Sequence, residues 1–581
     1  MKTKHINISI LLFLSIIFFH TLPSQAQNIP ENYFRSPVDF KITLSGTFAE
    51  LRNNHFHSGI DIRTFTTGKK VYAVADGIIS RIKVSSTGFG KALYINHPNG
   101  YTSVYAHLSK FSPKIEAYIK SQQYKRKKFA IDIDLSRIES HNKELFKIKK
   151  GDIIAHSGNT GSSMGPHLHF EVRETKSEKP INPMLLGLKI EDTISPKIYN
   201  LYVYPLDKNS SVNGKNTRQV FKAKASNKNA YSLGINKMKL HGRIGFAIHT
   251  QDHLNNTWGK CGINKLQLKI NESLVTNFSL NKFSYSETSY INSYIDYELN
   301  YKTNRKIHKA FIEPNNKLSF YKNMKSDGSY NFNTDENYKI ELSVYDSYNN
   351  KAKLQFTVTG DTSSIVFPEK KYDNLFKYDE ENLFSRSDID LKFPKDCFFS
   401  NLEFCYSKSQ DSTYLSPIHH IHKPNVGLNK YYSISIKMNK IDEDLSDKLV
   451  VVRINKDKRV SSVGGIYVNG YMKTKTKILG NYAVSQDTIA PTITTKTNYK
   501  NKNLKSLKFI DFTIKDNLSG IKTYQGKIDN KWVLFEFDKK KNRLFYTFDK
   551  ARIKRNMKHQ LELTVKDAVG NIGTYTCNFT W

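Results

Sequence analysis

The first part of the chain contains short apolar runs separated by glycine turns, a pattern typical of β-strands. These runs are Val71–Ala75, Gly77–Ile82, Ala92–Asn96 and Thr102–Ala106. The dipeptide Asn99-Gly100, between the last two runs, is a strong signal for a hairpin turn. The pattern predicts an antiparallel β-domain over residues 27–190.

One segment, residues 115–146, interrupts this β-pattern. Ile115, Tyr118 and Ile119 have helical spacing, and a basic run follows them. The segment is predicted to be an insertion that contains a helix and an irregular stretch.

From residue 191 onward the strands become longer and rich in Tyr, Asn and Lys, and part of the sequence repeats. The echoed parts are Asp192–Pro196 with Asp487–Pro491, Asp252 with Asp516, and Val344–Asn350 with Val565–Asn571. The repeat predicts two β-sandwich modules, at 191–363 and 486–581, that resemble bacterial immunoglobulin-like domains. The β-rich stretch between them, 364–485, is predicted to be a further β-sandwich.

Composition limits the class of protein. The chain has 581 residues with 34 Tyr and 35 Phe, which is too much core-forming material for a mostly disordered protein. No apolar run reaches the roughly 18 residues of a membrane span, so the mature chain should have no transmembrane segment.

The net charge of +36 is spread along the chain. This spread favours a solvated basic surface over a specific nucleic-acid site, and leaves anionic envelope polymers as candidate partners.

The N-terminus indicates export. Lys2 and Lys4 precede the apolar stretch Ile8–Phe19, and Ser24-Gln25-Ala26 has the small residues of a cleavage site. Residues 1–26 are therefore predicted to be a signal peptide.

None of the four cysteines lies in the first 260 residues, so a metal site there must use histidines and carboxylates. The pairing of the cysteines in disulfides stays open.

Three segments carry the candidate chemistry: His57–Asp61, Tyr105–Ser109 and Gly165–Val172. Residues two apart in a strand point to the same face, so His167 and His169 should project into one cleft. A catalytic zinc ion needs about three nitrogen or oxygen ligands and one open position. His57, Asp61 and His169 meet that need.

Two further histidines, His107 and His167, are then left for catalysis. They are candidates for the proton-transfer base and for the donor that stabilises the oxyanion. The sequence does not decide which histidine has which role.

These segments, in this order and spacing, resemble the lysostaphin/LytM-type zinc metallopeptidases that cut peptidoglycan peptides. The resemblance covers about residues 46–183, roughly a quarter of the chain. It implies that His57, Asp61 and His169 bind Zn²⁺ and that His107 and His167 act in catalysis. It also implies a small antiparallel β-sheet domain of the duplicated hybrid motif type. The insertion at 115–146 departs from the compact family pattern and would narrow or cover the substrate groove.

The sequence thus predicts a mainly β, exported zinc metalloendopeptidase that hydrolyses peptide cross-links of peptidoglycan in the periplasm or outside the cell. Two alternatives stay open. One is a catalytically silent scaffold that binds peptidoglycan or a regulator, and the other is a surface adhesin with a vestigial peptidase domain. The oligomeric state and the bond that is cut are not predicted.

Overall fold

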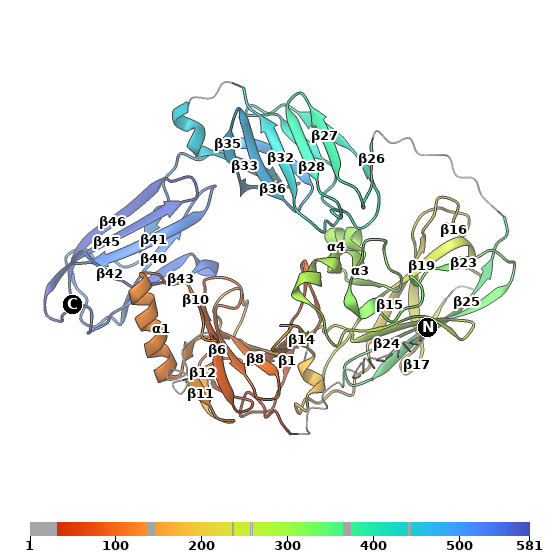
Figure 1. Ribbon diagram of the computed structural model, residues 1–581, viewed down its shortest axis with the longest axis horizontal. Helices are drawn as coiled ribbons and strands as arrows, with labels where there is room; N and C mark the ends of the chain where they lie inside the picture. The colour runs from red at the N-terminus through yellow and green to blue at the C-terminus, as the bar shows by residue number, and fades with distance from the viewer. Residues whose placement is uncertain are drawn as a thin grey trace, which may run out of the picture.

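The computed structural model describes residues 32–136, 146–234, 237–255, 257, 259–363, 374–439 and 443–581. The predicted signal peptide lies outside the described residues. The protein is mainly β, as predicted, and its modules follow one another round a ring (Figure 1). We refer to residues 32–190, 191–363, 374–485 and 486–581 as the first to fourth modules.

The first module is built on a nine-stranded antiparallel sheet. Its strands run in the order β1 (Leu44–Gly46), β4 (Ile60–Arg63), β13 (His167–Glu174), β8 (Tyr101–Leu108), β7 (Lys91–Asn96), β6 (Gly77–Val84) and β10 (Ile131–Asp134), with β14 (Pro180–Ile181) beside β13 and β11 (Lys147–Ile148) beside β6. Two smaller sheets consist of β5 (Lys70–Tyr72), β12 (Ile153–His156) and β9 (Lys110–Phe111), and of β2 (Leu51–Arg52) and β3 (His55–Phe56). The predicted Asn99-Gly100 turn joins β7 to β8, with Gly100 at φ 81°.

The helix expected near residue 115 is α1 (Pro113–Arg126). Proline suits its first turn, because that residue's missing N–H would have no partner there. Ile115 and Ile119 are buried against the first module, as their spacing predicts. Part of the predicted insertion, residues 137–145, lies outside the described residues.

The second module contains one eleven-stranded sheet. Its strands are β16 (Ser211–Val212), β19 (Lys239–Gln251), β15 (Lys197–Pro205), β17 (Gln219–Asn227), β18 (Ala230–Leu233), β25 (Lys351–Gly360), β24 (Asn337–Tyr345), β20 (Lys265–Ile270) and β21 (Ser273–Ser279), with β22 (Ile307–Lys309) and β23 (Tyr330–Phe332) beside β19. Two short helices, α3 (Ile291–Tyr294) and α4 (Tyr297–Thr303), lie toward the third module (Figure 1).

The third module has two five-stranded sheets and one two-stranded sheet. The first consists of β27 (Asn382–Arg386), β28 (Ile389–Phe393), β32 (Tyr432–Lys437), β36 (Tyr471–Thr476) and β35 (Ile466–Val468), the second of β30 (Tyr406–Ser409), β31 (Ile418–Ile421), β37 (Gly480–Gln486), β33 (Leu449–Ile454) and β34 (Val460–Gly464), and the third of β26 (Asn374–Phe376) and β29 (Leu402–Phe404).

The fourth module has a four-stranded and a five-stranded sheet around one apolar core. The sheets consist of β38 (Thr492–Thr494), β40 (Phe509–Lys515), β44 (Arg543–Thr547) and β43 (Phe535–Asp538), and of β39 (Lys502–Asn503), β46 (Ile572–Thr580), β45 (Lys558–Asp567), β41 (Ile521–Ile528) and β42 (Lys531–Val533).

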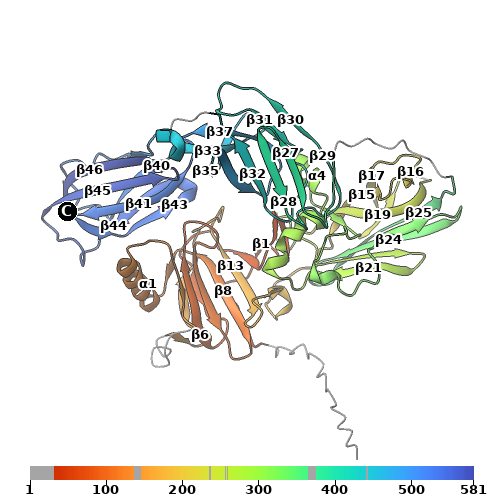
Figure 2. The same ribbon diagram turned by 45° about the horizontal axis from the view of Figure 1, so that its top comes forward.

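The ring closes where the fourth module meets helix α1 (Figure 2). The Tyr124 ring packs edge-on against Trp532, and the Arg552 guanidinium lies 3.8 Å from the centroid of the Tyr124 ring. Lys120 pairs with Asp549 at 2.8 Å. The first and fourth modules are thus held together by an aromatic and ionic contact.

The first and second modules share apolar packing. Phe48, Leu51 and Phe56 of the first module belong to the core of the second, where Phe56 lies 5.4 Å from the Phe283 ring and 6.1 Å from the Tyr294 ring. The first module on its own would expose these side chains.

No helix of the described residues is long and apolar enough to cross a membrane. The four cysteines are free thiols.

Because Phe56 is 2% exposed, Phe56→Ala should lower the free energy of unfolding of the joined first and second modules by about 3 to 5 kcal/mol. Urea unfolding followed by circular dichroism measures the change. Phe65→Ala is the matched control, since Phe65 is 74% exposed and its loss should cost less than about 0.5 kcal/mol. Equal transition midpoints for the two variants would contradict the shared core.

Candidate active site

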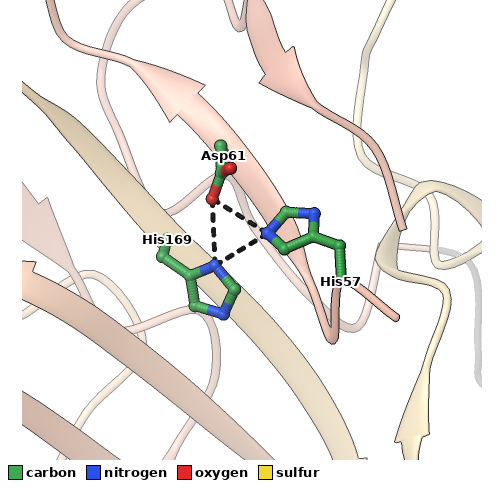
Figure 3. A group of neighbouring side chains, drawn as sticks. All are labelled: His57, Asp61 and His169. Atoms are coloured by element: carbon green, nitrogen blue, oxygen red, sulfur yellow. Dashed lines mark hydrogen bonds and ion pairs between the residues drawn. The ribbon is translucent and has the colours of Figure 1, made fainter. Parts of the chain in front are cut away.

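Two neighbouring strands and the loop before one of them bring three predicted ligands together. Asp61 on β4 lies directly opposite His169 on β13, so the two side chains share one face of the sheet. His57 lies just before β4. Its Nε2 is 3.0 Å from Asp61 Oδ1 and 3.0 Å from His169 Nδ1, which is itself 2.9 Å from Asp61 Oδ1 (Figure 3). Three ligand atoms that are distant in sequence therefore converge on one point.

The far nitrogen of each ligand histidine fixes its tautomer. His57 Nδ1 donates to the Thr47 carbonyl at 2.7 Å, and His169 Nε2 donates to Glu171 Oε1 at 2.8 Å. A carbonyl oxygen and an ionised carboxylate can only accept, so the proton of each neutral ring lies on that far nitrogen. The lone pairs of His57 Nε2 and His169 Nδ1 therefore face Asp61.

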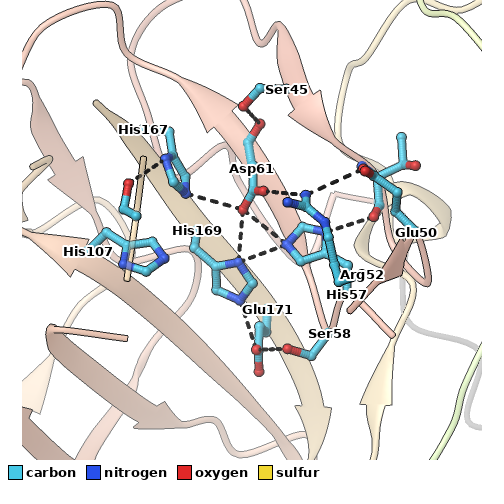
Figure 4. A network of polar contacts seen from close by, with 12 residues as sticks. Ser45, Glu50, Arg52, His57, Ser58, Asp61, His107, His167, His169 and Glu171 are labelled. Carbon is cyan, nitrogen blue, oxygen red and sulfur yellow. Dashed lines mark hydrogen bonds and ion pairs between the residues drawn. The ribbon is translucent and has the colours of Figure 1, made fainter. Parts of the chain in front are cut away.

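A buried ionic network holds Glu171 in its acceptor state. Burial opposes its ionisation, but Arg173 and His169 keep the pKa of Glu171 well below its usual range. Arg173 Nε donates to Glu171 Oε2 at 2.6 Å, and Ser58 donates to Oε1 (Figure 4). Tyr285 of the second module donates its hydroxyl to the same carboxylate at 3.0 Å. The second module thus supports the partner of a ligand histidine.

Asp61 divides its two oxygens between different neighbours. Burial opposes its ionisation, but the facing histidines hold the pKa of Asp61 well below its usual range. Its Oδ1 faces the histidines, whereas its Oδ2 accepts from Arg52 Nη2 at 2.9 Å. Arg52 also lies 3.4 Å from Glu50. The guanidinium therefore fixes the carboxylate without occupying the oxygen that faces the cluster.

A bulge near the end of β8 aims His107 at the site. The register between β7 and β8 shifts in the interval between Tyr105 and Leu108, and His107 has the left-handed φ of 59°. Bulges next to active sites commonly redirect a side chain, and a non-glycine residue with positive φ is strained. The His107 ring centroid lies 4.8 Å from that of His167 and 5.9 Å from that of His169.

His107 and His167 present the same nitrogen to the site. His107 Nδ1 donates to the Thr160 carbonyl at 2.9 Å, and His167 Nδ1 donates to the Gly165 carbonyl at 2.9 Å. Each neutral ring therefore keeps an unprotonated Nε2, and His167 Nε2 lies 3.4 Å from Asp61 Oδ1. Burial and the neighbouring histidines lower the pKa of His107 to about 3, so its ring is neutral at physiological pH.

The fourth module contacts the loop that precedes His167. Lys540 Nζ donates to the carbonyl oxygens of Asn159 at 2.5 Å and Ser163 at 2.6 Å. The Ser163 hydroxyl is in turn 3.1 Å from His167 Nδ1. Closure of the ring thus brings a lysine of the last module to the edge of the site.

All five residues singled out from the sequence lie together, whereas their supporting partners were not predicted. Glu171 could have been found, because it follows His169 by two residues on the same strand face. Thr47 and Thr160 act through backbone carbonyls, and Arg52 and Tyr285 act through side chains outside the three segments. No sequence pattern marks these four residues.

The donor set fits a divalent cation. Unprotonated nitrogens and a carboxylate oxygen about 3 Å apart repel one another unless positive charge lies between them. Burial alone would lower the pKa of His169, but Asp61 and Glu171 raise it to about 9, so without a metal the cluster retains a proton. Two imidazoles and one carboxylate match the ligands of catalytic zinc. Among the described residues, His57, Asp61 and His169 form one of three groups of side chains that could hold a metal ion, and the other two groups consist of aspartates alone.

Comparison with known proteins agrees with this geometry. Residues 55–124 and 134–183 match the model of peptidase family M23, and residues 373–487 match that of a Zu5-like domain. The DD-carboxypeptidase/endopeptidase Mpg of Neisseria meningitidis serogroup B is 33% identical over 132 residues, which cover 23% of this chain and 23% of the relative. The peptidoglycan DD-endopeptidase ShyA of Vibrio cholerae is 28% identical over 169 residues, which cover 28% of this chain and 32% of the relative.

Among solved structures, a variant of the catalytic domain of the prophage-encoded M23 protein EnpA from Enterococcus faecalis is 25% identical. The match covers 26% of this chain and 95% of that chain, with a TM-score of 0.18. The chain spans about a third or less of the length of the curated relatives it matches. The predicted resemblance is confirmed: the chain contains a peptidase M23 domain of the LytM type.

Glu171→Gln should weaken metal binding about 10- to 100-fold, because an amide is a poorer acceptor for His169 Nε2 and can present its N–H₂ instead. Zinc affinity measured by competition with a chromogenic chelator tests this. Glu178→Gln is the matched control, since Glu178 also pairs with Arg173 but its side chain is 56% exposed. Unchanged affinity in Glu171→Gln would exclude an orienting role for Glu171.

Proposed function

We propose that the protein is an exported zinc-dependent metalloendopeptidase that hydrolyses peptide cross-links of bacterial peptidoglycan. The observation that carries the proposal is the convergence of His57 Nε2, Asp61 Oδ1 and His169 Nδ1. Beside them lie His107 and His167, whose Nδ1 atoms bond to backbone carbonyl oxygens. The activities for which the M23 relatives in Neisseria and Vibrio are named support the choice of substrate class.

In this proposal His57, Asp61 and His169 hold Zn²⁺. When bound, zinc supplies the positive charge that polarises a peptide carbonyl and makes water more acidic. Asp61 contributes the one negative charge of the ligand set, and Arg52 holds its second oxygen away from the site. Thr47 and Glu171 keep the two ligand imidazoles in the tautomer that leaves the correct lone pair free.

His107 and His167 handle the proton in this proposal. Each ring is tied at Nδ1 to a carbonyl, so each can accept a proton only at Nε2. Once protonated there, the same atom becomes a donor for the negative charge that develops on the carbonyl oxygen or for the departing amine. The pair can thus supply both the base and the oxyanion donor.

The other modules have positioning roles in this proposal. The second and fourth modules are taken as immunoglobulin-like modules at 191–363 and 486–581, with the Zu5-like stretch between them. The net charge of +36 would favour an envelope rich in anionic polymers. Export by residues 1–26 to the periplasm or cell exterior places the enzyme at its substrate. No observation favours a silent scaffold or an adhesin, since all five expected site residues are present and adjacent.

The two groups of histidines should respond differently to substitution. His169→Ala should remove both zinc and activity, whereas His107→Ala should retain zinc and lose activity about 10²- to 10⁴-fold. The assay uses residues 27–581 with purified peptidoglycan sacculi. Zinc content is measured by mass spectrometry of the metal, and the masses of released fragments identify the bond that is cut.

His55→Ala is the control for these variants, because exposed His55 lies two residues from His57 and its ring bonds to the Asn53 carbonyl. It should retain zinc and activity. Full metal content and full activity in His169→Ala would refute the ligand assignment. Full activity in His107→Ala would remove His107 from the mechanism while leaving the ligand set intact.

A further inference from the structure

Two clusters of three aspartates lie at equivalent places in the second and fourth modules. The first aspartate cluster consists of Asp192, Asp252 and Asp346, and the second of Asp487, Asp516 and Asp567. In each cluster, one carboxylate oxygen from every residue lies within 4.8 Å of the others. The aspartates of the two clusters come from the repeated sequences of the chain. The repeated segments therefore place these acidic side chains at equivalent positions in the two modules.

Hydrogen bonds orient the Asp346 carboxylate of the first aspartate cluster. Asp346 Oδ1 accepts from the backbone N–H groups of Tyr348 and Asn350, each at 2.8 Å. The Asn350 side-chain amide donates to Asp346 Oδ2 at 2.6 Å and to the Asp192 carbonyl at 3.1 Å. The loop after β24 is thereby tied to the segment that enters the second module.

The second aspartate cluster repeats this arrangement. Asp567 Oδ1 accepts from the N–H groups of Val569 and Asn571, at 3.0 and 2.8 Å. The Asn571 side-chain amide donates to Asp567 Oδ2 at 2.7 Å and to the Asp487 carbonyl at 2.8 Å. The two loops have the same bonds at corresponding atoms.

The remaining aspartates, Asp252 and Asp516, each have a carboxylate oxygen with no hydrogen-bond partner among the described residues. Asp252 is 1% exposed, and its Oδ1 is buried without any hydrogen bond. Asp192 Oδ2 and Asp516 Oδ1 are likewise buried and unpartnered. Leaving an ionised oxygen buried in this way is costly. These oxygens belong to carboxylates that converge in the clusters. A partner for them should therefore lie between the carboxylates of each cluster.

No described lysine or arginine pairs with any of the six aspartates. Three neighbouring carboxylates need protons or a cation to balance their charge.

We propose that each aspartate cluster binds one Ca²⁺ ion. All ligand groups in the clusters are oxygens, which suit a hard cation and not the softer ions that prefer nitrogen or sulfur. Ca²⁺ accepts several carboxylates together with backbone carbonyls in a flexible geometry. Mg²⁺ demands a stricter octahedron and holds its water more tightly, so Ca²⁺ is the better fit to three carboxylates on separate segments.

The first aspartate cluster lies at a joint between modules. Asp192 precedes β15, at the entry to the second module, and Asp252 exchanges backbone hydrogen bonds with Cys261. Cys261 and Leu254 are buried in the core of the first module. The adjacent Gly262 N–H donates to the Thr47 hydroxyl at 3.2 Å. A cation in this cluster would therefore tie the second module to the first.

The second aspartate cluster lies at the joint between the third and fourth modules. Asp487 follows β37 directly. Lys448 of the third module donates to Asn571 Oδ1 at 2.7 Å, and Leu518 and Val569 pack against an apolar cluster of the third module. Each cation would thus stiffen one joint of the ring.

The number of bound ions tests the proposal. The chain of residues 27–581, freed of calcium and titrated with CaCl₂ in a calorimeter, should bind two ions per chain. Asp252→Asn and Asp516→Asn should each bind one, and the double variant none. Asp411→Asn is the matched control and should bind two, because exposed Asp411 accepts a backbone N–H two residues on, as Asp516 does, but lies outside both clusters.

Thermal unfolding separates a ligand role from a structural one. Ca²⁺ should raise the melting temperature of the wild-type chain, and Asp252→Asn should lose most of this rise. In EDTA, Asp252→Asn should melt no lower than wild type, because the substitution removes a buried unpaired charge. Equal losses of stability with and without Ca²⁺ would overturn the proposal, as would wild-type protein that binds no Ca²⁺ at millimolar concentration. Binding of Mg²⁺ in preference to Ca²⁺ would overturn the choice of ion.

Discussion

The meeting of three lone pairs at one point is the constraint on which the first module depends. His57 Nε2, Asp61 Oδ1 and His169 Nδ1 lie about 3 Å apart, an arrangement that repels itself unless positive charge lies between the atoms. The fold sustains it by pairing β4 with β13 and by accepting the two far imidazole protons at Thr47 and Glu171. Burial makes each of these acceptors necessary, because neither proton could be satisfied by water there.

This constraint extends into the second module. Tyr285 donates to Glu171, and Phe56, next to His57, is packed in the core of the second module. The site is thus framed by two modules, although all of its five central residues belong to one. A change in how the modules pack would act on the orientation of His57 and His169 through these contacts, without touching the ligand atoms themselves.

Sequence alone predicted the central residues because strand geometry and spacing carry local information. His167 and His169 alternate along β13, and the turn at Asn99-Gly100 follows from backbone preference. The left-handed backbone of His107 was not predicted, since it results from a bulge that only the pairing of β7 with β8 creates. Contacts such as that of Lys540 with Asn159 depend on the path of the whole chain, which local patterns do not encode.

That path links the two aspartate clusters to the site. Lys540 reaches the loop before His167 only if the chain turns by the correct amount at each joint between modules, because an angular error at one joint is magnified over the length of the modules beyond it. The clusters lie at the first and the last of these joints, where repulsion among three neighbouring carboxylates would favour opening and neutralisation would favour closure. The charge of the aspartate clusters at the joints and the closure of the ring over the edge of the site are therefore mechanically coupled.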